Sequence, residues 1–369
     1  MAAAAAVEAG ATLAGGVERG AGSRIAIVEE VDEHSPRVVH CSPVGECESK
    51  EADEPTHTTA CPDGAASAAS AGLAGAAGEE GGGDAFAFTH VASWQPSCLK
   101  DKDTRALLAK WGMGDSLVAA KFSFSRRLRL PQREGRAEAR KAQLGAFLRD
   151  ALNDATVKRA VPLGGTSSTG ATLAAGVTEV VFSELAVTKT SMSFFDRLEA
   201  EGIVHGPMWA TGTTGDDHEE DAGAGGTIKK QFDVVVDGVT CQDELRDALA
   251  NPDTEHVGLF DEEEEEAELL FRVFRQFVIG GSMCQWEDNV RPYLAVTQST
   301  YRDLVSVAKH PHTGQLVVKS TAVELQAVRH GTRRSTVLPS DSPFGNCWAV
   351  VDEERRTLTL WYCPFVSFW

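Results

Sequence analysis

The chain has 369 residues and a formal net charge of −19, from 54 acidic and 35 basic side chains. This acidic balance disfavours binding to nucleic acid, whose phosphates need a basic surface, and it also disfavours binding to anionic lipid. No apolar run reaches the roughly 18 residues that a membrane-spanning helix needs, so no membrane insertion is expected.

Residues 1–84 contain no Phe, Trp or Tyr and are rich in Ala and Gly. Such a segment buries too little apolar surface to offset the entropy of ordering its backbone, so we predict a disordered tail. Met1–Ala6 lacks the basic start of a secretory signal, and early acids such as Glu8 and Glu18 argue against a transit peptide. We therefore expect a cytoplasmic chain whose residues 85–369 form one globular domain.

The first part of this domain is predicted to alternate between strands and helices. Asp103 is a plausible N-cap for the first helix, and Leu144, Phe147 and Leu148 mark the inner face of the second. Residues 162–176 are rich in Gly, Ser and Thr and predict a flexible insertion. The expected elements are strand Phe86–Val91, helix Asp103–Met113, strand Leu117–Phe124, helix Ala137–Leu152 and strand Val177–Val187.

A second flexible insertion is predicted at residues 206–227, which are rich in glycine and acids. Before it, the helix Ser193–Glu201 has Ser193 and Asp196 at the spacing of a capping box. After it, Gln231–Thr240 reads as a strand ending in an Asp237-Gly238 turn, and a helix follows over Gln242–Ala250.

The acidic run Asp261–Glu268 has two interpretations. It could dock a basic partner, or it could be the solvated start of a helix, where carboxylates suit the positive end of the helix dipole. We favour the helix start, because the apolar residues that follow recur at helical spacing. This predicts one amphipathic helix of about 18 residues that ends at Gly280-Gly281.

Asn289 is placed to cap the next helix, with Pro292 in its first turn. That helix should end before a turn at Lys309–His312. Gln315–Val328 fits one long strand or two short ones, and residues 331–345 form a third flexible insertion. The apolar stripe of the helix is Val290, Tyr293, Leu294, Thr297, Tyr301, Leu304 and Val305.

The C-terminus predicts a hairpin, with strands Cys347–Val351 and Thr357–Cys363 around a charged turn. The sum is an α+β domain with helices concentrated in mid-chain and a mainly antiparallel C-terminal sheet.

Known catalytic and metal-binding patterns are mostly missing. Gly165–Thr172 has the glycine spacing of a phosphate-binding loop, but Ala171 stands where that motif needs Lys. His310 and His312 flank a proline and could share a metal, but two ligands make no site. The eight cysteines form no CxxC pair, and we predict no disulfide, metal or cofactor.

The segment Gly280–Val307 combines a glycine pair with a polar and aromatic cluster at Met283–Asp288. Cys284 could be a reactive thiol, although a buried thiol is favoured. Glu287 and Asp288 are adjacent, so they would diverge on a helix instead of converging as a catalytic pair. An enzyme of unrecognised type with a site at Cys284–Asp288 is kept as an alternative.

Some of these residues are candidates for contact with a protein partner, because aromatic side chains dominate binding hot spots. Each aromatic candidate also fits a core stripe, and that reading is favoured. The candidates are Phe194, Phe195, Trp286, Glu287, Asp288 and Tyr293.

Three long segments resemble the cilia- and flagella-associated protein 300 family, in the order found in that family. They are SMSFFDRLEAEGIV at Ser191–Val204, GGSMCQWEDNVRPYL at Gly280–Leu294 and TYRDLVSVAKHPHTGQL at Thr300–Leu316. Shorter similarities occur at Leu107–Met113, Phe147–Asp150 and Asp243–Leu249. The N-terminal tail and the insertion at 206–227 have no counterpart in this pattern.

The resemblance implies a non-enzymatic role in the assembly of motile cilia and flagella. It implies an adaptor for outer and inner dynein arms that works in the cytoplasm and binds dynein assembly factors or dynein subunits. It also implies entry into the cilium with the intraflagellar transport machinery. A permanent structural protein of the axoneme is the other alternative.

Overall fold

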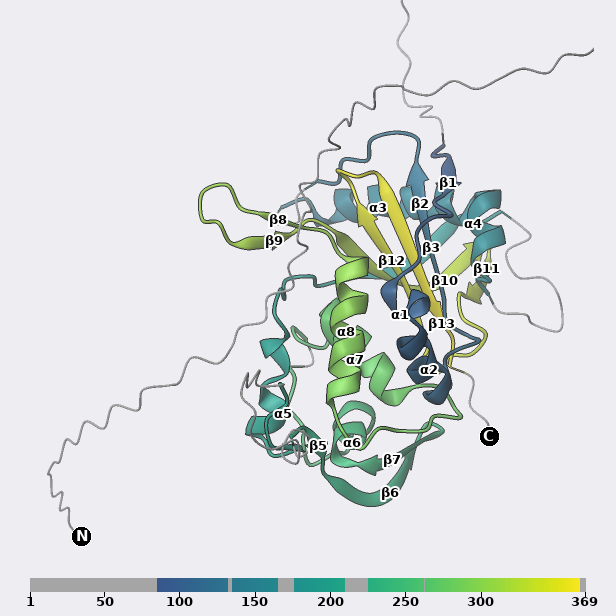
Figure 1. The fold of residues 1–369 in the computed structure, drawn as a ribbon. Coiled ribbons are helices and arrows are strands. Elements are labelled where there is room, and N and C mark those ends of the chain that lie inside the picture. Colours follow the sequence, from purple (N-terminus) through teal and green to yellow (C-terminus); the bar gives the residue numbers. More distant parts are fainter. Residues whose placement is uncertain (1–84, 132–134, 165–175, 210–224, 262, 366–369) are drawn as a thin grey trace, which may run out of the picture. The chain divides into compact units, whose positions relative to one another are not determined.

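The computed structural model describes residues 85–131, 135–164, 176–209, 225–261 and 263–365 (Figure 1). The predicted N-terminal tail, the segment Gly165–Thr172 and most of the insertions at 162–176 and 206–227 lie outside these residues. Phe86–Phe365 belong to one compact unit. Among the described residues, no helix is long and apolar enough to cross a membrane.

A seven-stranded antiparallel sheet lies at the centre of this unit and confirms the α+β class (Figure 1). The strand β10 pairs with β12 through its first half and with β11 through its second half, while β3 pairs along its other edge. The remaining order is β12, β13, β2, β1. The strands are β1 (Phe88–His90), β2 (Val118–Phe124), β3 (Glu179–Leu185), β10 (Thr321–His330), β11 (Arg333–Thr336), β12 (Asn346–Asp352) and β13 (Thr357–Cys363).

The two strands of the predicted C-terminal hairpin are buried on both faces. In β12, Cys347 and Ala349 face one hydrophobic cluster, whereas Trp348 and Val350 face the other. Cys363 lies on the Trp348 side of the sheet, so the two thiols of this hairpin point into different cores and both are free. Strands buried on both faces need a helical layer on each side.

The first helical layer consists of α3 (Ala137–Asn153) and α4 (Ala155–Ala160). Leu144, Phe147 and Leu148 are buried against the sheet, as the sequence predicts. The Phe147 ring lies 5.0 Å from the Phe124 ring in an edge-to-face arrangement. This aromatic packing fixes α3 over the edge of the sheet formed by β1 and β2.

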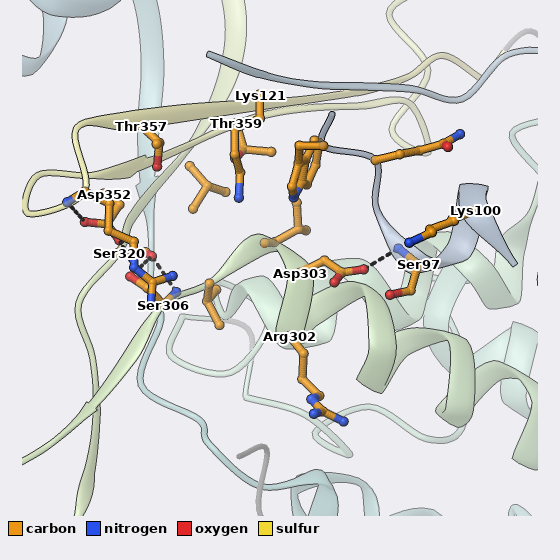
Figure 2. Close-up of a pocket in the computed structure, with 16 residues that line it drawn as sticks. Ser97, Lys100, Lys121, Arg302, Asp303, Ser306, Ser320, Asp352, Thr357 and Thr359 are labelled. Carbon is orange, nitrogen blue, oxygen red and sulfur yellow. Dashed lines mark hydrogen bonds and ion pairs between the residues drawn. The ribbon is translucent and has the colours of Figure 1, made fainter. Parts of the chain in front are cut away.

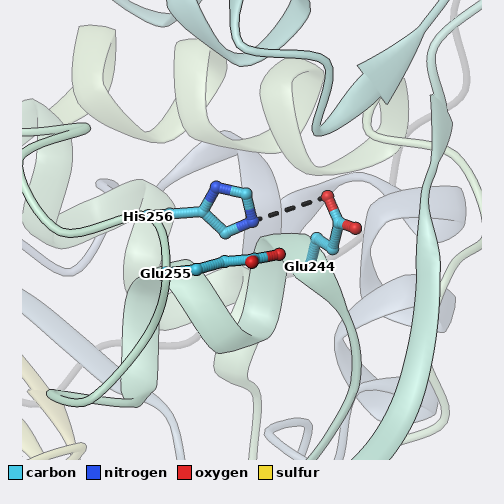
Figure 3. A group of neighbouring side chains, drawn as sticks. All are labelled: Glu244, Glu255 and His256. Atoms are coloured by element: carbon cyan, nitrogen blue, oxygen red, sulfur yellow. Dashed lines mark ion pairs between the residues drawn. The ribbon is translucent and has the colours of Figure 1, made fainter.

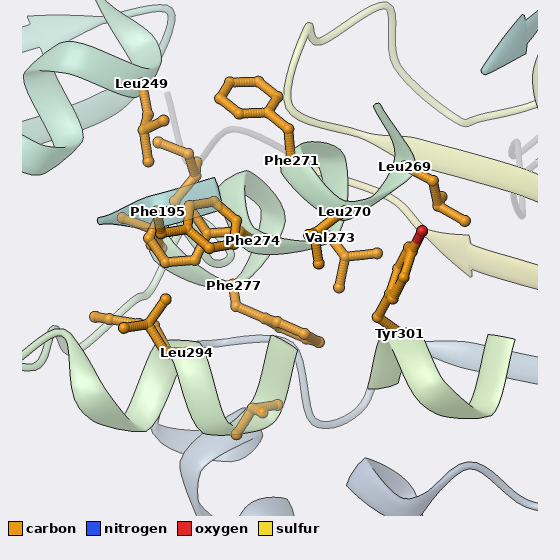
Figure 4. Packing of buried hydrophobic residues seen from close by; sticks show 14 of the residues in the cluster. Phe195, Leu249, Leu269, Leu270, Phe271, Val273, Phe274, Phe277, Leu294 and Tyr301 are labelled. Carbon is orange, nitrogen blue, oxygen red and sulfur yellow. The ribbon is translucent and has the colours of Figure 1, made fainter. Parts of the chain in front are cut away.

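The second layer is built around α7 (Leu269–Ile279) and α8 (Arg291–Leu304), whose apolar faces meet (Figure 4). Trp361 of the sheet donates its indole N–H to Gln276 Oε1 of α7 at 3.0 Å, which satisfies one polar group deep in this core. The predicted stripe of α8 is buried throughout. The helices α1 (Ser97–Lys100), α2 (Lys102–Lys110) and α6 (Glu244–Ala250) complete this layer.

The helix α7 is shorter than predicted, because the acidic run forms turns in front of it and not its first turns. Asp261 accepts backbone N–H groups of Glu263 and Glu264, which stabilises a turn. Glu265 pairs with Arg197, and Glu268 accepts hydrogen bonds from Thr188. These contacts hold the acids in turns and delay the start of the helix to Leu269.

The predicted capping box at Ser193 is wrong. The chain forms a 3-10 helix at Met192–Phe195, followed by α5 (Arg197–Ala200). Ser191 supplies the cap by accepting the N–H of Ser193, and Asp196 instead accepts the indole N–H of Trp209 at 2.8 Å. The N-cap of α2 is likewise Asp101 and not Asp103, because Asp101 accepts the N–H of Thr104.

Small hairpins complete the fold. The predicted Asp237-Gly238 turn is confirmed, since both residues have positive φ, at 46° and 84°. Gln315–Val328 forms two strands, not one, and the insertion at 331–345 contains β11 where only a loop was expected. The paired strands are β4 (Val204–His205) with β5 (Thr227–Ile228), β6 (Lys230–Val236) with β7 (Val239–Asp243), and β8 (Val307–Lys309) with β9 (Leu316–Val318).

Candidate functional site

The glycine pair after α7 lets two backbone segments touch. The N–H of Gly281 donates to Trp111 O at 2.8 Å, and the N–H of Gln285 donates to Lys110 O at 2.8 Å. A Cβ on Gly281 would lie 2.3 Å from Gly112 O, so no side chain fits there. The glycine pair therefore allows the segment after α7 to pack directly against the backbone at the end of α2.

Glu287 joins the same two segments through its side chain. Its carboxylate accepts the Trp111 indole N–H at 3.1 Å and lies 2.8 Å from the Lys110 ammonium. Its backbone N–H donates to the Tyr293 hydroxyl at 2.9 Å. Glu287 thus closes a ring of contacts from α2 to α8.

Arg246 of α6 is the buried centre of this arrangement. It pairs with Asp243 and donates to the Tyr293 hydroxyl at 2.5 Å. Its guanidinium lies 5.3 Å from the centre of the Trp286 ring and 5.6 Å from that of Tyr293. The polar and aromatic cluster at Met283–Asp288 therefore covers a buried network of charged and polar side chains.

This geometry offers no catalytic pair. Burial raises the pKa of the Cys284 thiol to about 12, so the thiol stays protonated and is a poor nucleophile. Asp288 is exposed and pairs with Lys230 at 2.5 Å, and this hydrogen bond lowers the pKa of the Asp288 carboxyl. Glu287 and Asp288 have different partners and do not converge.

The other candidate residues also divide between core and surface. Phe194, Phe195 and Tyr293 are buried, so they stabilise the interior. Trp286 is half-buried and covers Arg246. His310 and His312 are exposed with ring centres 5.8 Å apart, and no third ligand among the described residues joins them.

A polar cleft of about 370 Å³ is a stronger candidate for binding (Figure 2). Ser97 and Lys100 come from α1, Arg302 and Asp303 from the end of α8, and Lys121, Thr357 and Thr359 from the sheet. Ser306, Ser320, Asp352 and Arg355 line its other end. The cleft thus opens where the second helical layer meets the sheet.

Positive charge exceeds negative charge in this cleft. Its four basic side chains outnumber its two carboxylates, in a chain whose net charge is −19. Both carboxylates are already engaged: Asp303 accepts the N–H of Ser97 at 2.5 Å, and Asp352 accepts the N–H of Arg355 at 2.8 Å. The Lys121 ammonium lies 4.5 Å from the centre of the Trp94 ring.

These residues can hold an acidic or phosphorylated segment, because lysine and arginine supply charge while serine and threonine hydroxyls donate hydrogen bonds. Sequence reasoning missed the cleft. Its residues come from five separate stretches of the chain between Trp94 and Thr359 that have no common motif. The sequence does show basic residues on strands and at helix ends, but only the tertiary structure brings them together in one cleft.

Comparisons with known proteins agree with the resemblance noted in the sequence. The family model described as "Cilia- and flagella-associated protein 300" matches residues 85–363. A protein of that name from Chlamydomonas reinhardtii is 27% identical over 285 residues, which cover 77% of this chain and 99% of the relative. A protein of the same name from Paramecium tetraurelia is 24% identical over 271 residues, covering 73% and 91%. No solved structure matches the chain.

Proposed function

This chain belongs to the cilia- and flagella-associated protein 300 family, and from that premise we propose that it is a non-enzymatic assembly factor for motile cilia and flagella. In this proposal it acts as an adaptor for outer and inner dynein arms. It binds dynein assembly factors or dynein subunits in the cytoplasm and enters the cilium with the intraflagellar transport machinery.

The observation that carries this proposal is the extent of the family match. It covers residues 85–363, and the Chlamydomonas relative aligns over 99% of its length. The predicted adaptor role also fits the geometry at Cys284–Asp288, where the thiol is protonated and the two acids diverge. A polar cleft with excess positive charge provides a surface for a partner segment.

The decisive experiment removes the protein from a flagellated cell. Electron microscopy of null axonemes should show loss of both outer and inner dynein arms, with re-expression restoring them. Intact arms in the null strain would overturn the proposal.

Fractionation separates an adaptor from a permanent axonemal component. Isolated flagella are extracted first with detergent and then with high salt. We expect the protein to leave with the detergent-soluble matrix, whereas retention with the salt-washed axoneme would support a structural role instead.

A further inference from the structure

Glu244, Glu255 and His256 bring three metal-ligating groups together at the start of α6 and in the loop that follows it (Figure 3). Their ligand atoms all lie within 4.8 Å of one another. Glu244 is the first residue of α6, and the other two follow that helix in the loop Asn251–Leu259. From these three side chains we propose a zinc-binding site, which is independent of the proposed role in dynein-arm assembly.

The distances suit a tetrahedral ion. His256 Nε2 lies 3.4 Å from Glu244 Oε2. With metal–ligand bonds of about 2.0–2.2 Å, two ligands of a tetrahedral zinc ion are separated by roughly 3.4 Å. Glu255 is exposed and belongs to a loop, so its carboxylate can complete the third position by a change of rotamer.

The His256 ring directs one nitrogen, Nε2, towards the carboxylate of Glu244 (Figure 3). Its Nε2 atom is buried and has no hydrogen-bond partner, although a carboxylate oxygen lies nearby. A buried polar atom without a partner is costly and calls for an explanation. A zinc ion between Nε2 and the two carboxylates would satisfy this atom.

The surrounding contacts hold the ligands in place. The Lys229 ammonium pairs with the Oε1 atom of Glu244, which leaves Oε2 directed at His256. Asp247 accepts hydrogen bonds from Asn251 Nδ2 at 2.8 Å and Thr254 Oγ1 at 2.6 Å. Thr254 Oγ1 in turn accepts the N–H of His256 at 3.2 Å. Such outer contacts orient ligands and strengthen metal binding.

The charge favours a divalent cation, and the ligand types favour zinc over calcium and magnesium. Two carboxylates and one lysine leave a net charge of −1 when the imidazole is neutral, and a divalent cation reverses this. Calcium and magnesium prefer all-oxygen ligands, whereas an imidazole suits zinc. Glu255 and His256 also line a surface cavity of about 400 Å³, which gives room for water as a further ligand.

The test is a zinc titration of the full-length, chelator-stripped protein by calorimetry, with zinc chloride as the probe. Wild-type protein should bind zinc, and His256→Ala should lower the zinc affinity at least about tenfold. Loss of a ligand should cost no less than loss of a supporting contact around a metal site. Glu255→Gln should weaken it as well, and because Glu255 is exposed this variant should keep its fold by circular dichroism. The matched control is the double variant His310→Ala, His312→Ala. It removes a pair of histidines that lies outside the proposed site, so the zinc affinity should stay unchanged.

X-ray absorption of the zinc-loaded protein gives a second readout. We expect nitrogen and oxygen neighbours at about 2.0–2.2 Å, with an imidazole contribution that disappears in His256→Ala. Sulfur neighbours at about 2.3 Å would assign the metal to cysteines and overturn the proposal. Unchanged affinity in both His256→Ala and Glu255→Gln, or no zinc binding by the wild type, would overturn it too.

Discussion

The hydroxyl of Tyr293 joins three segments of the chain. It accepts hydrogen bonds from the buried guanidinium of Arg246 and from the backbone N–H of Glu287. No motif marks this role, because the three residues come from a helix, a loop and another helix. The sequence places Tyr293 in the apolar stripe of α8, and the structure adds that its polar end organises a network.

Removing that hydroxyl should destabilise the fold. In Tyr293→Phe the ring still packs, but Arg246 and the Glu287 N–H lose their acceptor, and we expect unfolding to become easier by about 1–3 kcal/mol. Urea denaturation measures this change. The control is Asp288→Asn, which breaks an exposed pair with Lys230 and should alter stability by only about 0–1 kcal/mol. Equal stability of Tyr293→Phe and wild type would contradict the network.

Four buried or partly buried thiols give a second prediction at this scale. Burial raises the pKa from 9.0 to about 11 for Cys98 and to about 12 for Cys241, Cys284 and Cys363. Iodoacetamide at pH 8 should therefore leave these four residues unmodified in the native protein and label them after denaturation, as peptide mass spectrometry can show. Rapid native labelling of Cys284 would revive the hypothesis of a reactive thiol.

The same shifts set the sign of a pH effect. The folded state keeps these thiol protons above pH 9, whereas the unfolded state releases them. Each thiol thus stabilises the fold fully below about pH 9, and that contribution is lost progressively as the pH rises towards 12.

Between elements, the contact of the α7–α8 connection with the end of α2 depends on two glycines. Gly281 lies against the carbonyl group of Gly112, where a Cβ would be 2.3 Å from the oxygen. The sequence predicts that this glycine pair ends a helix, and that part is confirmed. The close backbone contact is visible only once α2, more than 160 residues earlier in the chain, is packed beside it.

An added methyl group at this contact should be poorly tolerated. Gly281→Ala must push two backbone segments apart, and we expect a loss of stability of about 3 kcal/mol, the upper end for overpacking. The matched control is Gly176→Ala, where a Cβ would make ordinary contact with Asn153 at 3.8 Å. Comparing the two thermal midpoints tests the claim, and a Gly281→Ala variant as stable as Gly176→Ala would refute it.

At the scale of the whole molecule, the polar cleft depends on both helical and sheet layers. If it holds an acidic or phosphorylated segment of a dynein-related partner, reversing its charge should weaken that contact. Lys100→Glu with Lys121→Glu should reduce recovery of dynein subunits and assembly factors from cytoplasm by about tenfold or more, as close charge pairs at interfaces allow. Quantitative mass spectrometry of tagged protein pull-downs measures the change.

The matched control reverses two exposed charges in the opposite helical layer, Lys141→Glu in α3 and Arg159→Glu in α4. It makes the same change in net charge but leaves the cleft intact. Equal recovery of these partners with both double variants would show that the cleft is not their docking surface.

The sequence by itself determined the class of fold, most of its elements and its family. Apolar periodicity and turn residues report local structure, which explains why the α8 stripe, the Asp237-Gly238 turn and the C-terminal hairpin were predicted well. The start of α7 and the cap at Ser191 were missed, because distant partners such as Thr188 and Trp209 decide which acid is free to cap a helix. The tertiary structure alone decided the Arg246 network, the polar cleft and the Glu244–Glu255–His256 cluster. Each joins residues that are far apart in sequence or turned towards each other only by packing, and no local pattern carries that information.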